Sequence, residues 1–261
     1  MRRRARSQLR RVRAWRTQQR LAGPRLIRAF ADACPQAFFI EIGSNDGNQH
    51  DHLHPYILGR GWTGIMVEPV PYVFERLRRN YRAIDRVALE NIAVGERDGE
   101  LPFYYLRDAG EAERRTLPDW YDGIGSFSRE TVLNHASHIP DVERRLVSRS
   151  VPTLTFESLC ERHRVGRLDL LVIDTEGYDW RILRDIDFGR RRPQVLVYEH
   201  YHLSSEDQAE CVEYLTSNGY QTMAEGFDTF CLADEVSGGL RSTWKSLRPG
   251  VAALSKHEEA S

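Results

Sequence analysis

The sequence has few cysteines, only two lysines and no long apolar run. The four cysteines stand apart, with no C-x-x-C pair and no histidine cluster beside them, so we expect reduced thiols in a cytoplasmic protein and no disulfide framework. No apolar run reaches the roughly 18 residues that a transmembrane helix needs. The basic amino terminus also lacks the apolar stretch that follows it in a secretory signal. These absences favour a globular protein of ordinary composition.

Basic residues are scarce outside the amino terminus. Residues 1–31 hold eleven arginines and no acid, and the other 230 residues carry 26 basic and 38 acidic groups, a balance of −12. An acidic body argues against a general nucleic-acid binder. We expect residues 1–30 to form a solvated arginine-rich tail, for which a contact with lipid, nucleic acid or a partner stays open. Residues 241–261 are expected to be a second, loose tail.

Between these tails, apolar runs alternate with amphipathic stretches. Strands are expected at 37–42, 62–67, near 87–94, 168–173, 194–198, 220–223 and 227–232, and helices near 73–81, after 177 and over 204–217. This alternation predicts one α/β domain over 31–240, with a mostly parallel sheet covered on both faces and an antiparallel hairpin at its end. Residues 101–151 interrupt the alternation, so we expect an insertion over the active site.

Ligands of an open α/β sheet bind beyond the carboxyl ends of its strands. The first strand is followed by a G-x-N-x-G pattern (Gly43, Asn45, Gly47) in place of the G-x-G-x-x-G dinucleotide fingerprint. Asp46 within this loop would repel a pyrophosphate, whereas it suits a ligand with a cationic amine and a sulfonium, such as S-adenosylmethionine (SAM). The alternative is that Asp46 only caps the following helix.

Polar residues also end the second and third strands. Glu68 stands 22 residues after Asp46, a spacing and place that suit an acid accepting both ribose hydroxyls of a nucleoside. Near the third strand, Glu90, Asn91 or Ala93 could pair with an adenine edge, and the pattern does not separate the three.

Two acids and a histidine follow the next two strands. Asp174 and Glu176 fit proton abstraction, binding of a substrate hydroxyl, or metal binding. His200 is the favoured general base because an unperturbed imidazole titrates near neutrality, although a structural histidine is an open alternative. In a less favoured variant, Asp174, Glu176 and His200 hold magnesium or manganese. The favoured site contains no metal.

Three further histidines, His50, His52 and His54, follow the loop after the first strand. On a helix, His50 and His54 would share a face and could meet a metal or the substrate. Their spacing matches none of the strict zinc patterns, so a solvated helix start is the favoured interpretation.

Together these segments resemble the FkbM family of methyltransferases. The resemblance rests on residues 39–47 (FIEIGSNDG), 64–69 (GIMVEP), 91–94 (NIAV) and 173–179 (IDTEGYD), with Glu199-His200 at the next strand end. It implies a Rossmann-like class I methyltransferase fold with a seven-stranded sheet, SAM as the methyl donor, and a hydroxyl acceptor on a sugar, polyketide or other secondary metabolite.

The resemblance also implies roles for individual residues. Glu41, Gly43, Asn45 and Gly47 would line the methionine end of SAM and Glu68 its ribose, while Asp174 and Glu176 would face the reaction centre. With Asp46 and Asn91 from the strand-end argument, these are the expected cofactor residues. The rival hypotheses are an NAD-dependent oxidoreductase, a non-catalytic SAM-fold binding module, and a nucleic-acid methyltransferase, which would need a base-handling motif that the sequence lacks.

Overall fold

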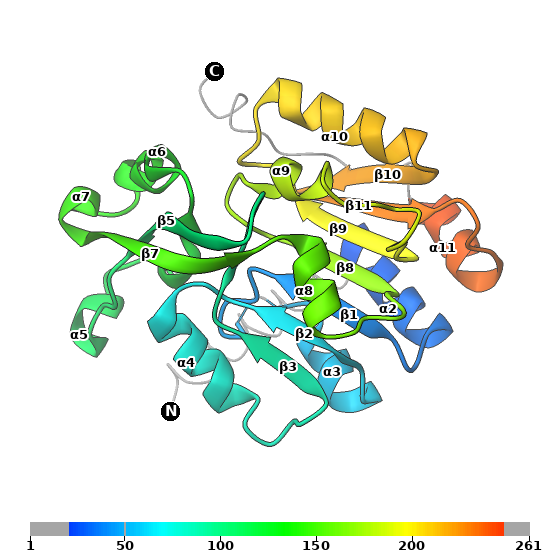
Figure 1. The fold of residues 1–261 in the computed structure, drawn as a ribbon, viewed down its shortest axis with the longest axis horizontal. Helices are drawn as coiled ribbons and strands as arrows, with labels where there is room; N and C mark the ends of the chain where they lie inside the picture. Colours follow the sequence, from blue (N-terminus) through cyan, green and yellow to red (C-terminus); the bar gives the residue numbers. More distant parts are fainter. Residues whose placement is uncertain (1–20, 50, 248–261) are drawn as a thin grey trace, which may run out of the picture.

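The computed structural model describes residues 21–49 and 51–247, and its central layer is a seven-stranded sheet (Figure 1). The strand order is β10-β11-β9-β8-β1-β2-β3. The strands are β1 (Phe38–Ile42), β2 (Thr63–Val67), β3 (Val87–Glu90), β8 (Leu170–Ile173), β9 (Val195–Glu199), β10 (Tyr220–Glu225) and β11 (Asp228–Ala233). The pairs β9–β11 and β10–β11 are antiparallel and the others are parallel. The expected mostly parallel seven-stranded sheet with a carboxyl-terminal hairpin is confirmed.

Helices cover both faces of this sheet because its strands are apolar on both sides. Ile40 and Ile42 of β1 face one core, while Phe39 faces the other. The first core is covered by α8 (Phe156–Arg162), α9 (Asp179–Leu183) and α10 (Ser205–Ser217), and the second by α2 (Ala22–Ala33), α3 (His54–Arg60), α4 (Pro71–Asn80) and α11 (Gly238–Leu247).

Part of each expected tail belongs to the folded domain. Residues 22–30, expected in the amino-terminal tail, belong to α2, which buries Leu26 and Phe30 completely. The carboxyl-terminal α11 likewise continues to residue 247 and buries Trp244. The apolar side chains of α2 are spaced about one helical turn apart, so the helix packs against the sheet on one side. Arg25 and Arg28 remain on its exposed side. Residues 1–20 lie outside the described residues, and no described helix is long and apolar enough to cross a membrane.

The single strand expected near 87–94 is two strands in two different sheets. β3 belongs to the main sheet, and β4 (Ala93–Val94) pairs with β7 in a second sheet. Asn91 stands at the division, where its side-chain amide donates to the backbone oxygens of Glu68 and Pro69 at 2.7 and 3.2 Å. The chain therefore leaves the main sheet at this point.

The expected insertion folds as a second layer with its own core. Its four-stranded sheet has the order β4-β7-β5-β6. Besides β4, its elements are β5 (Gly99–Leu106), α5 (Glu111–Arg114), η1 (Tyr121–Gly123), β6 (Gly125–Ser126), α6 (Arg129–Leu133), η2 (Asn134–Ser137), α7 (Val142–Arg145) and β7 (Leu146–Leu154). Figure 1 shows this layer in green, extending away from the main sheet above α4. It starts before residue 101 and ends after residue 151, so it is wider than expected.

Candidate active site

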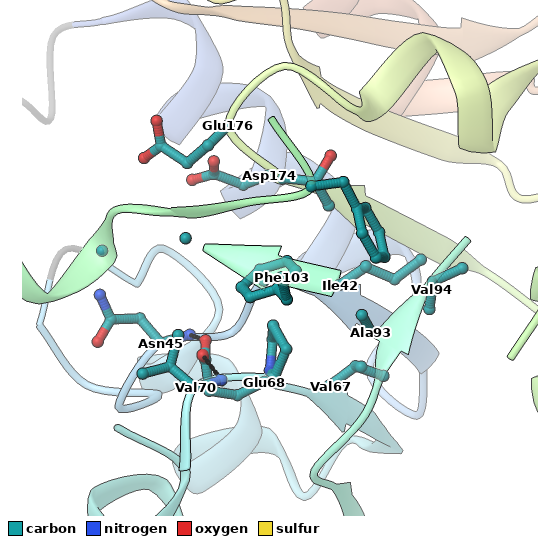
Figure 2. Close-up of a pocket in the computed structure, with 16 residues that line it drawn as sticks. Ile42, Asn45, Val67, Glu68, Val70, Ala93, Val94, Phe103, Asp174 and Glu176 are labelled. Atoms are coloured by element: carbon teal, nitrogen blue, oxygen red, sulfur yellow. Dashed lines mark hydrogen bonds between the residues drawn. The ribbon is translucent and has the colours of Figure 1, made fainter. Parts of the chain in front are cut away.

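A pocket opens where β1, β2 and β8 end, in the place that parallel sheets offer to ligands (Figure 2). Gly43 and Asn45 reach it from the loop after β1, Glu68 from the end of β2, and Asp174 and Glu176 from the loop after β8. These five residues, which the sequence analysis selected from separate motifs, are brought together.

The loop after β1 is shaped by residues in left-handed backbone conformations. Gly43 has φ = +85°, and a Cβ atom there would lie 1.7 Å from the backbone oxygen of Asp174. Only glycine allows the ends of β1 and β8 to approach this closely. Asn45 also has positive φ, 48°, which asparagine tolerates better than most residues.

Glu68 is buried and is held by the backbone on both sides. Its Oε2 accepts the backbone N–H of Asn45 at 3.0 Å, and its Oε1 accepts that of Val70 at 2.8 Å (Figure 2). These two hydrogen bonds favour the charged carboxylate, but burial outweighs them and raises the pKa of Glu68 to about 8. The side chain is thus fixed at the pocket, and each oxygen keeps a second lone pair for a ligand.

Asp46 and Asn91 are engaged elsewhere and do not line the pocket. Asp46 Oδ1 accepts the backbone N–H groups of Asn48 and Gln49 at 2.9 and 2.8 Å within a turn, and it does not cap a helix, because α3 begins only at His54. The amide of Asn91 is directed at backbone oxygens of the segment after β2, as described above. Of the three candidates near the third strand, Ala93 lines the pocket, whereas Glu90 contacts His163 at 2.7 Å.

Glu41 and Gly47 support the loop from behind. Glu41 lies in the middle of the sheet, where burial raises its pKa, and the nearby charges of Asp51 and Asp174 raise it further. Gly47 packs against Tyr81, whose hydroxyl donates to the Gly47 oxygen at 2.9 Å. Neither residue lines the pocket, and Glu41 points away from Ile42, which does, because successive residues of a strand point to opposite faces.

His54, one of the three histidines after this loop, also braces it. Its Nδ1 lies 2.7 Å from the backbone oxygen of Gly47 and 3.2 Å from the hydroxyl of Tyr81. His50 is outside the described residues. His54 therefore has a structural role next to the pocket.

The loop after β8 gives the pocket an acidic wall. Figure 2 shows the carboxylates of Asp174 and Glu176 close together and pointing the same way. The surrounding protein desolvates Asp174 and raises its pKa to about 6, although its side chain remains exposed to the pocket. No basic side chain stands among the described residues that line this pocket.

More acids lie behind this wall. The buried Asp179 accepts a hydrogen bond from the Thr175 hydroxyl at 2.8 Å and another from the backbone N–H of Glu199 at 3.2 Å, so it ties the loop after β8 to the end of β9. Burial, then the charge of Asp174, raises the pKa of Asp179 to about 8 and that of Asp228 to about 7. Carboxyl groups with raised pKa values gather at functional sites, and here they lie behind the pocket wall.

His200, the expected general base, is placed away from the pocket. Its ring is buried, and Nδ1 lies 3.0 Å from the hydroxyl of Thr229. Its backbone oxygen accepts the side-chain amide of Gln208 at 3.0 Å. This environment corresponds to the structural alternative for His200.

Two other histidines, which the sequence analysis did not select, stand next to Glu176. His202 Nε2 lies 3.2 Å from Glu176 Oε2, and the rings of His135 and His202 stack with centroids 5.5 Å apart. His202 lies in the same segment after β9 as His200, so its position near a strand end could have identified it from the sequence. His135 lies in the inserted layer, where no spacing relates it to the other motifs.

A family model described as the methyltransferase FkbM domain matches residues 41–222. A solved FkbM methyltransferase from Methylobacillus flagellatus KT is 13% identical, with a TM-score of 0.47, over 76% of this chain and 44% of that one. The precorrin-6y C5,15-methyltransferase of Geobacter metallireducens GS-15 is 10% identical, with a TM-score of 0.38, over 76% of this chain and 81% of that one.

A ribosomal protein L11 methylase from Lactobacillus delbrueckii subsp. bulgaricus is also 10% identical, with a TM-score of 0.38, over 79% of this chain and 74% of that one. The present chain spans less than half the length of the solved FkbM protein. No curated protein matches the sequence significantly.

Proposed function

The chain belongs to the FkbM methyltransferase family, and on that premise we propose that it binds SAM in the pocket at the ends of β1, β2 and β8. The methyl group is then transferred to a hydroxyl oxygen of a small-molecule or glycan acceptor, such as a sugar, a polyketide or another secondary metabolite.

The observation that carries the proposal is the charge of the pocket. Glu68, Asp174 and Glu176 line it, and no basic side chain stands among its described lining residues. SAM brings a sulfonium and an ammonium group, whose positive charges compensate these carboxylates. The pyrophosphate of a nicotinamide dinucleotide brings negative charge instead and would be repelled, which argues against the oxidoreductase alternative.

The parts of SAM can be assigned to different walls. Glu68 is fixed by the Asn45 and Val70 amides, so it presents lone pairs to the ribose hydroxyls without a cost for ordering its side chain. Ala93 and Phe103 offer an apolar surface to the adenine ring. The methionine end then lies toward Asp174, on the acidic side.

The transfer needs an acceptor oxygen in line with the methyl group and the sulfur. The oxygen–carbon bond forms as the sulfur–carbon bond breaks, S-adenosylhomocysteine leaves, and the hydroxyl proton passes to a carboxylate. Asp174 is the group that we assign to accept this proton, because its side chain faces the pocket. His200 is not assigned this role, since its ring is buried against Thr229.

Calorimetric titration with SAM and with NAD⁺ tests the cofactor. We expect SAM to bind and NAD⁺ not to bind. In the Glu68→Gln variant, SAM affinity should fall about tenfold to a hundredfold, because a charge-assisted hydrogen bond is worth roughly 1.5–3 kcal/mol.

The matched control is Glu75→Gln on α4, where an exposed carboxylate pairs with Arg78 at 2.8 Å, and the SAM affinity of this variant should be unchanged. Binding of NAD⁺ in preference to SAM would overturn the proposal. Tight SAM binding without methylation of hydroxyl-bearing acceptors would favour the non-catalytic binding module.

A further inference from the structure

We propose that His135, Glu176 and His202 form a binding site for a divalent metal ion on the wall of the pocket. Each of the three offers one ligand atom, and these atoms all lie within 4.8 Å of one another. The side chains are shielded, since that of His202 is 4% exposed and that of Glu176 is 17% exposed. The role given below to the metal in acceptor binding rests on the proposed function, whereas metal binding itself does not.

Three separate segments meet at this site, and specific contacts hold two of them together. Gly177 has φ = +94°, and a Cβ atom there would lie 3.3 Å from the Cβ of His202, so the loop after β8 packs tightly against the loop after β9. The backbone oxygen of Glu176 accepts the hydroxyl of Ser126 at 3.1 Å, which fastens this loop to β6 of the inserted layer.

Glu176 itself adopts a strained backbone conformation, with φ = 54°. A residue other than glycine in this region costs about 1 kcal/mol or more, and such strain clusters at functional sites. The strain persists here because the loop is fixed on both sides. This backbone conformation places the Glu176 carboxylate between the pocket and the two imidazoles.

The surroundings of the two histidines resemble those of metal ligands. His135 Nδ1 lies 3.1 Å from the backbone oxygen of Thr131, and donation from Nδ1 to this carbonyl selects the tautomer with its lone pair on Nε2. On the far side of His202, Nδ1 lies 4.0 Å from Glu199 Oε2, which is an ion-pair separation and longer than a hydrogen bond. The carbonyl behind His135 is thus the usual support of a ligating imidazole, and a carboxylate stands near His202.

The donor set indicates which class of metal fits. Two imidazole nitrogens and one carboxylate oxygen suit Zn²⁺ and the neighbouring first-row divalent ions better than Mg²⁺, which prefers an all-oxygen shell. Three protein ligands also leave a coordination position for a substrate oxygen. The variant set from the sequence, Asp174, Glu176 and His200, is not the one that the structure brings together, because His200 faces Thr229.

The metal site would take part in acceptor binding in the proposed reaction. Glu176 lines the pocket and also belongs to the three-residue cluster, so an ion held there would border the space for the acceptor. It would bind the acceptor hydroxyl and favour its deprotonation. His135 comes from the inserted layer, so closing the metal site would also position that layer over the acceptor.

Titration of chelator-treated protein with Co²⁺, followed by its visible absorption, tests the site, with Zn²⁺ as the competitor. We expect one class of site whose spectrum Zn²⁺ abolishes. The affinity for Co²⁺ should fall at least about tenfold in the His135→Ala and His202→Gln variants. The matched control is His138→Ala, an exposed histidine of the same segment that is not one of the three ligands and should bind as the natural protein does.

Several outcomes would overturn the metal site: no Co²⁺ binding, undiminished binding in both ligand variants, or an equal loss in His138→Ala. Circular dichroism checks that the variants fold. If His202→Gln does not fold, His135→Ala decides, because its side chain is only partly buried. Titration of the same metal-free protein with SAM separates the two proposals, since intact SAM binding without metal binding removes the metal site alone.

Discussion

Gly43 shows how a single backbone position can join two motifs, since the residue that it contacts, Asp174, lies 131 residues further along the chain. A Cβ atom at this position would meet the backbone of Asp174, which cannot move aside as a flexible side chain could. We predict that Gly43→Ala abolishes SAM binding and lowers the free energy of unfolding by at least about 2 kcal/mol, because positive φ and the clash act together. Calorimetry and denaturant titration measure the two effects.

The matched control for Gly43 is Gly59→Ala. Gly59 lies in helix α3, and a Cβ atom there meets nothing within 4 Å. Alanine should therefore leave SAM binding unchanged and leave stability equal or slightly higher. Equal SAM affinity in Gly43→Ala and Gly59→Ala would contradict the role assigned to Gly43.

At the same scale, the sequence predicts which residues end the strands but not where each side chain points. Glu68, Asp174 and Glu176 reach the pocket as expected, since all three follow apolar strands of one parallel sheet. Asp46 and His200 stand equally close to strand ends, yet the first caps a turn and the second turns toward Thr229. Moving a residue by one position along the chain can turn its side chain to the opposite side, and amino-acid composition does not encode this direction.

At the scale of elements, the inserted layer is fastened to α4 by Asp122 of η1. Its side chain, 12% exposed, pairs with Arg76 at 2.6 Å and with Arg114, and also accepts the Tyr72 hydroxyl at 3.1 Å. These arginines lower the pKa of Asp122 despite its partial burial. The network sets the position of the layer whose Gly123, Gly125 and Phe127 line the pocket.

We predict that Asp122→Ala raises the KM for the acceptor and lowers the free energy of unfolding by about 2–4 kcal/mol, because two arginines lose their partner. The KM for SAM should change less, since Glu68 is held by the backbone N–H groups of Asn45 and Val70, which lie outside the inserted layer. The control is Glu111→Ala, an exposed acid of α5. An increase in the KM for SAM alone would contradict this division of roles.

Element prediction succeeded where apolar runs are continuous and failed where a few tertiary contacts decide. The strands of the main sheet are short continuous apolar runs, which their composition identifies. The division between β3 and β4 depends on the contacts of Asn91, and the end of the tail depends on the packing of Leu26 and Phe30 in α2. Such tertiary contacts override local composition.

At the scale of the whole molecule, raised carboxyl pKa values make stability depend on pH. Glu68 and Asp179 have pKa values of about 8 in the folded state, and Asp51 and Asp228 of about 7, with burial as the main cause. In the unfolded chain these groups titrate near about 4. The folded state therefore retains protons that the unfolded state has released, so stability falls as pH rises from about 4 to about 8.

We predict that the melting temperature of the ligand-free protein falls between about pH 5 and pH 8, and that SAM reduces this fall because its positive charges favour the ionised carboxylates. In Glu68→Gln the fall should be smaller, since one titrating group is removed. Thermal melts across this range, with and without SAM, provide the measurement. A melting temperature that rises throughout the window would show that these carboxyls are ionised in the folded protein.

The whole-molecule prediction from sequence was correct for the main sheet and incomplete for the rest. Alternating strands and helices specify the parallel α/β sheet, and the family motifs cover it. The second sheet joins β4, β5, β6 and β7 through pairings across tens of residues, such as Gly99 with Thr153. These pairings depend on the tertiary structure of the insertion, which no local sequence pattern predicts.

The position of β11 constrains how this chain can be synthesised and folded. This strand, 228–233, lies between β9 and β10, so until it has been made β10 has no partner strand in the sheet and β9 is paired on one side only, with β8. The central strand β1 likewise waits for β8, which begins at Leu170. The amino-terminal half therefore cannot complete the main sheet by itself, and strand edges of this sheet stay open until residues 170–233 have been synthesised.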